Sequence, residues 1–375
     1  MKQANIILLF FCIGYGAVAQ QRARDLGLRF GLLEPGKLNA ITDVMGVRVG
    51  HTTLLKGDQI RTGVTAIIPA PGNIFQDKLP AAIFVGNGYG KLAGITQVKE
   101  LGNLETPIIL TNTLSVPVAM DALIGYTLEQ KGNETVQSVN AVVGETNDGI
   151  INDIRGRHVT KEDVLNALYN AKDGPVAEGS VGAGTGTVAF GFKGGIGTAS
   201  RKLPTIMNGY TVGVLVQTNY GGMLEIGGVP IMKELAKQKP IDELQKKADG
   251  SCMIIVATDA PLDSRNLERL AKRAFMALSK TGSYASNGSG DYVIAFSTDT
   301  SLRIPHNPRI KTTNPVLLQN DAVNGLFQAA VEATEEALVN SLFMANPVKS
   351  KDNKVIPALP IDEVLKILRR YNRIY

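Results

Sequence analysis

The chain has 375 residues, of which 44% are hydrophobic and 19% are charged, a composition that excludes disordered, collagen-like and coiled-coil proteins. Its 39 basic and 34 acidic residues are interspersed along the sequence. The densest basic cluster is only Arg369, Arg370 and Arg373 near the end of the chain, so we expect no nucleic-acid partner.

The beginning of the chain differs in kind from the rest. Lys2 precedes an apolar stretch over 6–18, and a small-x-small pattern ends at Ala19. This arrangement is typical of a secretory signal peptide, 1–19, cleaved after Ala19. An uncleaved membrane anchor is the alternative, but the stretch is short for about 30 Å of hydrocarbon. We expect export to a bacterial periplasm or the extracellular space, and no membrane association of the mature chain.

The later segments alternate between strand and helix patterns. Apolar runs bounded by Gly, Pro or Asn predict strands over 65–70, 81–86, 107–111, 141–144, 187–192, 211–218, 253–258 and 292–298. Helical periodicity predicts helices over 116–130, 161–171, 264–279, 322–343 and 361–370, with start signals at Thr160 and Ser264. Because a helix does not follow every strand, the order favours layered sheets with helices outside. We predict an α/β sandwich in a single domain over 20–375.

Metal and conventional triad chemistry find little support in the sequence. The three histidines, His51, His158 and His306, are far apart and lack helical i, i+4 spacing, so no zinc pattern exists, although a carboxylate-only site stays open. No Gly-x-Ser-x-Gly elbow lies between a strand and a helix. We interpret His51 as a structural histidine rather than a base, and we expect no metal.

A glycine-rich stretch, 182–187, is similar to a nucleotide loop. A dinucleotide fingerprint must open a helix whose amides face the pyrophosphate. Here a strand-like run over 188–192 follows instead, and the Gly-Lys-Ser/Thr ending of a phosphate-binding loop is absent. We therefore expect no cofactor and interpret these glycines as tight backbone geometry between strands.

The junction of Gly250 and Ser251 carries more specific chemistry. It lies between a polar, turn-prone stretch over 246–250 and a buried apolar strand. In a chain that cuts itself, the serine hydroxyl attacks the preceding carbonyl, the glycine permits the strained backbone, and the resulting ester hydrolyses. The α-amine released on Ser251, with a reference pKa of about 7.7 to 8.0, then serves as the local proton acceptor. Taken alone, the motif favours the alternative, a turn followed by a strand-initiating serine.

Several passages of the chain together change that balance. They read NAITDVMGVRVGHTT over 39–53, GETNDG over 144–149, VLVQTNYG over 214–221, DGS over 249–251 and NGSGDY over 287–292. In combination and in order, over 26–371, they resemble the DmpA and BapA group, the L-aminopeptidase/D-esterase and β-peptidyl aminopeptidase family. The resemblance implies a four-layer αββα sandwich similar to N-terminal nucleophile hydrolases, with DmpA-type connectivity. It also implies autocleavage into chains 20–250 and 251–375, which stay paired and assemble as a homo-oligomer.

The resemblance further implies roles for individual residues. Ser251 matches the family's nucleophile, and Ser289 and Asp291 match a supporting serine and an acidic residue. Asn219 matches the side chain that donates to the oxyanion, and Glu145 matches the carboxylate that receives the substrate's free amino group. Some members have Glu where this chain has Asp291, which is one methylene shorter and reaches less far toward the free amine or Ser289.

The residues themselves agree with an aminopeptidase, which needs an anion near the nucleophile to fix the ammonium end of a short peptide. Glu145, Asp148 and Asp291 are candidates at Gly-rich strand ends, and of these we interpret Asp148 as structural. Cys252 follows the nucleophile in a strand and is expected to point to the other face as a buried thiol. Because Cys12 lies in the signal, Cys252 is the only cysteine of the mature chain, and no disulfide forms within it.

We predict a secreted, self-processing serine aminopeptidase that removes N-terminal residues from small peptides, amides or esters through an acyl-enzyme. Two alternatives stay open. An acyltransferase on the same fold would pass the acyl group to an amine instead of water, although export argues against that role. A non-catalytic binding protein would keep the bond between Gly250 and Ser251 intact.

Overall fold

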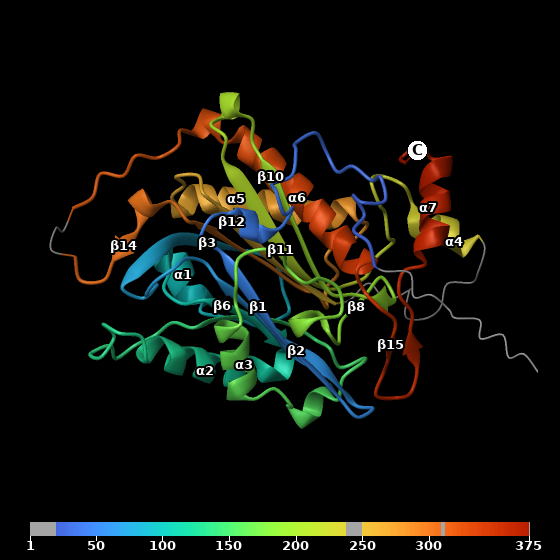
Figure 1. Ribbon diagram of the computed structural model, residues 1–375, viewed down its shortest axis with the longest axis horizontal. Coiled ribbons are helices and arrows are strands. Elements are labelled where there is room, and N and C mark those ends of the chain that lie inside the picture. Colours follow the sequence, from blue (N-terminus) through green and yellow to red (C-terminus); the bar gives the residue numbers. More distant parts are fainter. Residues whose placement is uncertain (1–19, 238–249, 309–311, 375) are drawn as a thin grey trace, which may run out of the picture.

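The computed structural model describes residues 20–237, 250–308 and 312–374. Two β-sheets lie face to face in its centre, and helices cover their outer faces (Figure 1). The predicted signal peptide, 1–19, and most of the predicted polar stretch over 246–250 lie outside the described residues. Within the described residues, no helix combines the length and the apolar character needed to cross a membrane.

The larger sheet has seven strands and contains the apolar runs of the second half of the chain. In spatial order its main path is β10 (Ile196–Lys202), β11 (Thr211–Asn219), β12 (Ser251–Thr258), β13 (Gly290–Ser297), β3 (Asp77–Gly88) and β14 (Ile304–Pro305), and β5 (Asn103–Leu104) also pairs with β3. The central pair, β12 and β13, is parallel, and its neighbours on both sides are antiparallel to it. Parallel pairing makes β12 and β13 begin at the same edge of the sheet.

The smaller sheet has five strands. In spatial order they are β1 (Arg48–Lys56), β2 (Ile60–Ile68), β6 (Ile108–Asn112), β7 (Val142–Thr146) and β4 (Leu92–Ala93). Strands β6 and β7 are parallel, and the other pairs are antiparallel. Two short hairpins lie outside both sheets: β8 (Val188–Ala189) with β9 (Phe192–Lys193), and β15 (Val348–Lys349) with β16 (Val355–Ile356).

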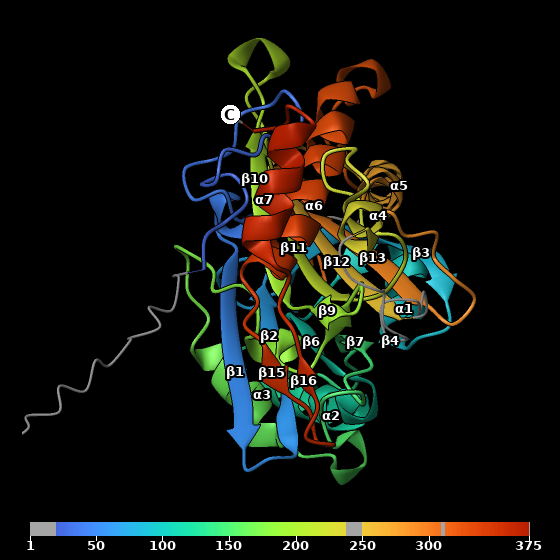
Figure 2. The ribbon, with the colours of Figure 1, turned by 90° about the vertical axis from the view of Figure 1, so that its right-hand side faces the viewer.

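Long helices form the two outer layers. Helices α5 (Ser264–Lys280) and α6 (Asn324–Phe343) pack on the seven-stranded sheet, whereas α2 (Val116–Leu128) and α3 (Lys161–Tyr169) pack on the five-stranded sheet. Figure 2 shows α7 (Ile361–Arg370) beside α4 (Ile231–Ala236), both outside the sandwich, and the short helix α1 (Ile95–Leu101) contacts β3. The α/β sandwich predicted from the order of strands and helices is confirmed.

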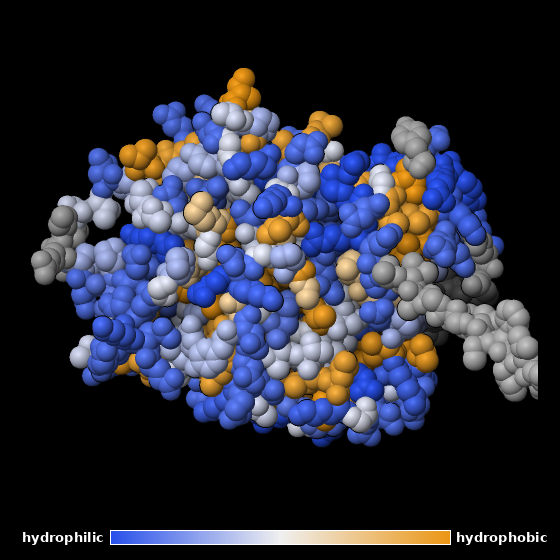
Figure 3. Space-filling view, viewed as in Figure 1, coloured by the Kyte–Doolittle hydropathy of each residue, from blue (hydrophilic) through white to orange (hydrophobic). Residues whose placement is uncertain are grey.

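The pleat of β12 shows how one apolar run serves two interfaces. Met253 and Ile255 face the five-stranded sheet, whereas Cys252, Ile254 and Val256 face the helices α5 and α6. A strand covered on both faces reads as a continuous hydrophobic run, which is why the sequence predicted it so clearly. The face of the molecule in Figure 3 is by contrast mainly hydrophilic, with apolar side chains scattered among polar ones.

The structure also corrects parts of the sequence prediction. The segment 187–192 is not one strand, because Phe190 and Gly191 adopt positive φ angles of 52° and 78° and turn the chain into the β8–β9 hairpin. Strands β1 and β10 were missed because polar side chains interrupt their apolar patterns. The predicted helix over 322–343 begins at Asn324, two residues later than expected.

Candidate active site

Four strand ends of the seven-stranded sheet meet at one edge. Ser251, the first residue of β12, lies opposite Gly290 of β13 on one side and Asn219, the last residue of β11, on the other. Strand β3 ends there as well, because Gly88 pairs with Gly290. The parallel pairing of β12 and β13 therefore brings together residues that lie far apart in the sequence.

The backbone around Ser251 is tightly enclosed. The Gly290 N–H donates to the carbonyl oxygen of Gly250 at 3.0 Å and lies 3.3 Å from the Oγ of Ser251. A Cβ atom on Gly250 would lie 2.0 Å from the carbonyl oxygen of Asn219, so a side chain cannot be accommodated there without backbone movement. The bond between Gly250 and Ser251 is thus held beside the hydroxyl, with its carbonyl polarised by a fixed donor.

Asp291 is a buried carboxyl group that is only partly satisfied. Its side chain is hydrogen-bonded to the Ser289 side chain and to the backbone of Cys252. Its Oδ2 is buried and has no hydrogen-bond partner among the described residues. Burial raises the pKa of Asp291 to about 6, and the two hydrogen bonds only partly oppose this rise. The structure thus brings Asp291 and Ser289 together next to Ser251, with one acceptor oxygen left over.

The amide of Asn219 has a defined orientation. Its Oδ1 accepts a hydrogen bond from the Val188 N–H at 3.0 Å. The oxygen of the amide therefore faces β8, and the NH₂ group lies on the side of the amide away from the Val188 N–H. Since Asn219 lies opposite Ser251, an NH₂ group at this edge of the sheet is suited to stabilise negative charge on a reacting carbonyl.

Glu145 reaches the same edge from the five-stranded sheet. Its Oε1 accepts from the Lys91 N–H at 2.9 Å, and its Oε2 accepts from the Thr113 hydroxyl. A Cβ atom on Gly90 would lie 3.1 Å from Glu145 Oε1 and 3.3 Å from the Cα of Gly290. Gly90 thus fills the narrow space between Glu145 and the strand that contacts Ser251. A side chain at position 90 would separate the two halves of the site.

Asp148 and Cys252 lie close in sequence to Glu145 and Ser251, whereas His51 lies far in sequence from every predicted site residue. Asp148 is buried and accepts from Asn152, and burial raises its pKa to about 6. His51 Nδ1 lies 2.9 Å from the Thr65 hydroxyl, and burial lowers the pKa of His51 to about 4, which keeps the ring neutral. Its Nε2 has no partner within the described part of the chain. Cys252 is a fully buried free thiol, as predicted.

The glycine-rich stretch is not a helix entry. Gly182–Gly184 forms a single 3₁₀ turn, and the chain continues into β8. A Cβ on Gly182 would lie 2.5 Å from the Thr65 hydroxyl, so these glycines permit close backbone packing. Across residues 20–237, 250–308 and 312–374, no three His, Cys, Asp or Glu side chains are grouped to hold a metal ion.

Sequence reasoning missed several contributors to this edge. The Val188 N–H bonds to Asn219, and Gly90 and Thr113 lie against Glu145. Lys193 lies opposite Val188 in the β8–β9 hairpin. Gly90 carried a weak signal, because it belongs to a run of glycines after an apolar strand. Lys193 carried none, since a single lysine beside an apolar run is usually a solvated strand end, whereas here its side chain is fully buried.

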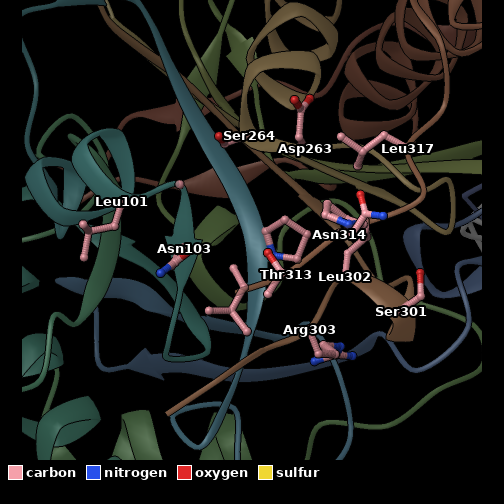
Figure 4. A pocket seen from close by; sticks show the side chains of 14 residues that line it. Leu101, Asn103, Asp263, Ser264, Ser301, Leu302, Arg303, Thr313, Asn314 and Leu317 are labelled. Atoms are coloured by element: carbon pink, nitrogen blue, oxygen red, sulfur yellow. The ribbon is translucent and has the colours of Figure 1, made fainter. Parts of the chain in front are cut away.

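A hollow lies at the end of the seven-stranded sheet opposite to Ser251. It has a volume of about 310 Å³, and Figure 4 shows that its lining includes Leu101, Asn103, Asp263, Ser264 and Arg303. These residues surround the ends of β12 and β13 rather than their beginnings. None of the predicted site residues, all of which the structure describes, lines this cavity. It is separate from the candidate active site.

The layered architecture, with a serine at the start of a central strand of the sandwich, defines a variant of the N-terminal nucleophile hydrolase class. The model of peptidase family S58 matches residues 39–356, which is most of the chain. The chain belongs to peptidase family S58, and the protein is a hydrolase of the serine aminopeptidase type.

Individual relatives agree with this assignment. The β-peptidyl aminopeptidase BapA of Sphingosinicella microcystinivorans is 39% identical over 397 aligned positions, which cover 100% of this chain and 98% of the relative. The PH0078 protein of Pyrococcus horikoshii OT3 has a TM-score of 0.88 and 48% identity, covering 94% of this chain and 100% of that one.

The L-aminopeptidase D-Ala-esterase/amidase of Ochrobactrum anthropi has a TM-score of 0.87 and 34% identity, and the match covers 94% of this chain and 99% of that one. Its structure is described as a prototype for the serine aminopeptidases and a new variant among the Ntn hydrolase fold. The family resemblance and the fold class predicted from the sequence are both confirmed.

Proposed function

We propose that this aminopeptidase is exported and self-processing, and that Ser251 attacks small peptides, amides or esters that carry a free amino group. The observation that carries the proposal is the position of Ser251 as the first residue of β12, with the preceding carbonyl held by a backbone donor. The order of steps is cleavage of the chain, binding of the substrate's amine, acylation of Ser251 and hydrolysis.

Processing begins with attack of Ser251 Oγ on the carbonyl carbon of Gly250. A C–O bond forms, the C–N bond breaks, and the hydroxyl proton is transferred to the departing amine. Water then hydrolyses the ester, which leaves a carboxylate on Gly250 and a free amine on Ser251. The Gly290 N–H, at 3.0 Å from the scissile carbonyl oxygen, stabilises the negative charge that develops on it. The products are the chains 20–250 and 251–375.

In the processed enzyme, the new α-amine accepts the proton of the Ser251 hydroxyl as it attacks the substrate carbonyl. The Asn219 NH₂ group stabilises the tetrahedral oxyanion. Glu145 receives the substrate's ammonium group, and this pairing selects for a free N-terminus. Asp291 offers its remaining oxygen to the ammonium form of Ser251. The leaving amine or alcohol departs with that proton, and water releases the acyl group.

The substrate class follows from the small number of groups that recognise the substrate and from the relatives. One relative is named a β-peptidyl aminopeptidase, and another is named an L-aminopeptidase D-Ala-esterase/amidase. We extend to this chain the shared requirement, a free amine beside a cleavable acyl bond. Export by the predicted signal 1–19 to a periplasm or the extracellular space, and assembly of the paired chains into a homo-oligomer, are parts of the same proposal.

The decisive experiment is denaturing intact-mass spectrometry of the exported protein and its Ser251→Ala variant. We expect the wild type to give fragments that end at Gly250 and begin at Ser251, and the variant to remain one chain. Cys252→Ala is the matched control, because Cys252 is adjacent but faces the opposite side of β12; its processing is expected to be normal. A wild type that stays uncut would contradict self-processing and favour a binding protein.

Hydrolysis is then separated from acyl transfer with an aminoacyl p-nitroanilide. We expect p-nitroaniline and the free amino acid in equal amounts. Addition of a second amine as acceptor is expected to leave the yield of free amino acid nearly unchanged. A yield that falls as the acceptor is raised, with formation of the corresponding amide, would favour the acyltransferase.

A further inference from the structure

The orientation of Asn219 depends on one backbone donor. An asparagine amide has two orientations of nearly the same shape, and they exchange the oxygen and the NH₂ group. With the oxygen directed at a reacting carbonyl, Asn219 would repel the oxyanion instead of stabilising it. The Val188 N–H, at 3.0 Å from Asn219 Oδ1, selects the productive orientation.

Val188 belongs to the β8–β9 hairpin, which is fixed directly to the end of β11. The Phe190 N–H donates to the carbonyl oxygen of Tyr220 at 2.8 Å, and the two rings pack edge to face at 5.0 Å. Tyr220 follows Asn219 in the chain. Lys193 lies directly opposite Val188 across the hairpin. The position of the Val188 N–H therefore depends on the contacts that fix the β8–β9 hairpin relative to the rest of the protein.

The side chain of Lys193 holds the hairpin from inside the protein. This side chain is fully buried, and its ammonium group donates to the carbonyl oxygens of Gly184 at 2.7 Å and Gly194 at 2.6 Å. These two glycines flank the hairpin, one before β8 and one after β9. A Cβ atom on Gly184 would lie 2.5 Å from the backbone nitrogen of Ile196, and one on Gly194 would lie 2.6 Å from the carbonyl oxygen of Thr218. Both segments are therefore packed against neighbouring backbone too closely for a side chain.

Burial of an ammonium group is costly unless its donors are used. Burial lowers the pKa of Lys193 to about 7, and the charge of Asp148 opposes this effect. An apolar side chain of similar length would fill the same space without that cost. It would remove the ammonium donor from the buried Gly194 carbonyl and leave the Gly184 carbonyl with the Thr187 hydroxyl, at 3.1 Å. What the ammonium provides is a fixed path for the backbone on both sides of Val188.

We propose that Lys193 is a positioning residue for catalysis, which keeps the Val188 N–H in place and through it the amide of Asn219. The proposal rests on the proposed function, because it assigns the oxyanion role to Asn219. Processing uses a different donor, since the Gly290 N–H holds the carbonyl of Gly250. Loss of Lys193 should therefore slow hydrolysis and spare autocleavage, which a merely structural lysine would not do.

The test is a double-mutant cycle on the processed enzyme with an aminoacyl p-nitroanilide. Lys193→Met is expected to lower kcat about 10- to 100-fold, below the roughly 10²- to 10³-fold loss typical for removal of an oxyanion donor. KM is expected to change less than about twofold, because Glu145 lies on the other sheet. In an Asn219→Ala background, Lys193→Met is expected to cost less than a further factor of about two. Lys202→Met, at an exposed lysine of β10, is the control with unchanged kcat.

The outcomes separate this proposal from the proposed function. If Asn219→Ala and Ser251→Ala lose activity but Lys193→Met does not, the proposal about Lys193 alone is wrong. A Lys193→Met loss that persists in full in the Asn219→Ala background overturns it as well. An Asn219→Ala enzyme with the kcat of the wild type, or a Ser251→Ala protein that still hydrolyses the substrate, contradicts the proposed site itself. Lys193→Gln, which retains an amide donor, is made in parallel; if both variants fail to fold or to process, Lys193 is a folding residue and the proposal fails.

Discussion

Two buried polar clusters in this protein are built on opposite principles. The first, the ionic cluster, lies between the N-terminal segment and α6 and contains Arg22, Arg24, Glu178, Arg201, Glu332 and Glu336. The second is the candidate active site at the start of β12. In the ionic cluster, the fully buried Arg201 guanidinium contacts both Glu332 and Glu336, and Glu336 also accepts from Arg24. The active site instead contains a buried carboxyl group with an unused oxygen.

The pKa directions of Glu336 and Asp291 illustrate the difference. Within the ionic cluster Glu336 is the carboxyl group with two arginine partners, whereas Glu178 pairs with Arg22 and burial still raises its pKa to about 7. Burial acts to raise the pKa of Glu336, but the hydrogen bond from Arg24 and the charges of Arg201 and Arg24 outweigh it, so the pKa is lowered. Burial also raises the pKa of Asp291, and there it prevails, because the hydrogen bonds to Ser289 and Cys252 carry no positive charge. A fully paired cluster stabilises the fold, whereas an incompletely paired one is available for chemistry.

The ionic cluster also connects the two chains that processing would create. Arg22, Arg24 and Arg201 belong to 20–250, whereas Glu332 and Glu336 belong to 251–375. The pairing does not depend on the bond between Gly250 and Ser251, so it explains how the two chains would stay together after cleavage.

The largest effect on stability is expected from Arg201→Met. It leaves Glu332 without its arginine and Glu336 with only Arg24, and the free energy of unfolding should fall by about 3–5 kcal/mol. The measurement is urea unfolding in the uncut Ser251→Ala protein, where both segments remain one chain. A loss below about 1 kcal/mol would mean that the ionic cluster contributes little to the fold.

In the active site, Asn219→Ala is expected to act on rate instead. Removal of the oxyanion donor should lower kcat by about 10²- to 10³-fold, equivalent to roughly 2.7–4 kcal/mol of transition-state stabilisation. Autocleavage should still occur, since its carbonyl is held by Gly290. Kinetics with an aminoacyl p-nitroanilide and intact-mass spectrometry provide the two readouts. Loss of stability larger than that of Arg201→Met would contradict the distinction between the clusters.

Asp291 predicts a pH dependence of stability. Because its pKa is raised from 3.8 to about 6 in the folded chain, the unfolded chain releases the proton first, and stability falls as pH rises from about 4 to 6. The difference corresponds to roughly 3 kcal/mol. We expect Asp291→Asn to remove this fall in the Ser251→Ala background.

The measurement is the free energy of unfolding between pH 4 and 8 for the two proteins. Asp148 and Glu178, whose pKa values burial raises to about 6 and about 7, are present in both, so the difference between the curves isolates Asp291. Parallel curves would show that the carboxyl group of Asp291 is not buried as described.

The smallest effect is expected at an exposed ion pair on α5. Glu268 and Lys272 pair at 2.9 Å with more than 40% of each side chain exposed. Glu268→Ala should therefore change the free energy of unfolding by less than about 0.5 kcal/mol, and added salt should reduce even that. A change near that of Arg201→Met would remove the contrast between paired charges in the core and at the surface.

Local patterns in the sequence were sufficient to predict the sandwich and most of its long elements. The runs of β11, β12 and β13 are apolar because both of their faces are covered, and the helices α5 and α7 show one apolar face. The position of Ser251, between a polar stretch and an apolar run, was equally visible. The family resemblance added Asn219 and Ser289, which no local pattern distinguishes, and it assigned roles to Glu145 and Asp291 among the acidic residues at Gly-rich strand ends.

Tertiary structure alone decided which polar residues are buried and what they contact. Strand β10 escaped prediction because Thr198, Ser200 and Arg201 break its pattern, and their partners lie more than 100 residues away in α6 or near residue 40. The acceptors of Lys193 are by contrast near in sequence, at Gly184 and Gly194, and they meet its ammonium group because the chain turns back on itself in the β8–β9 hairpin. Periodicity in a sequence reports which face of an element is covered, because it reflects local geometry. Pairing of charges and hydrogen bonds reports which distant segments meet, and that depends on the assembled sheets.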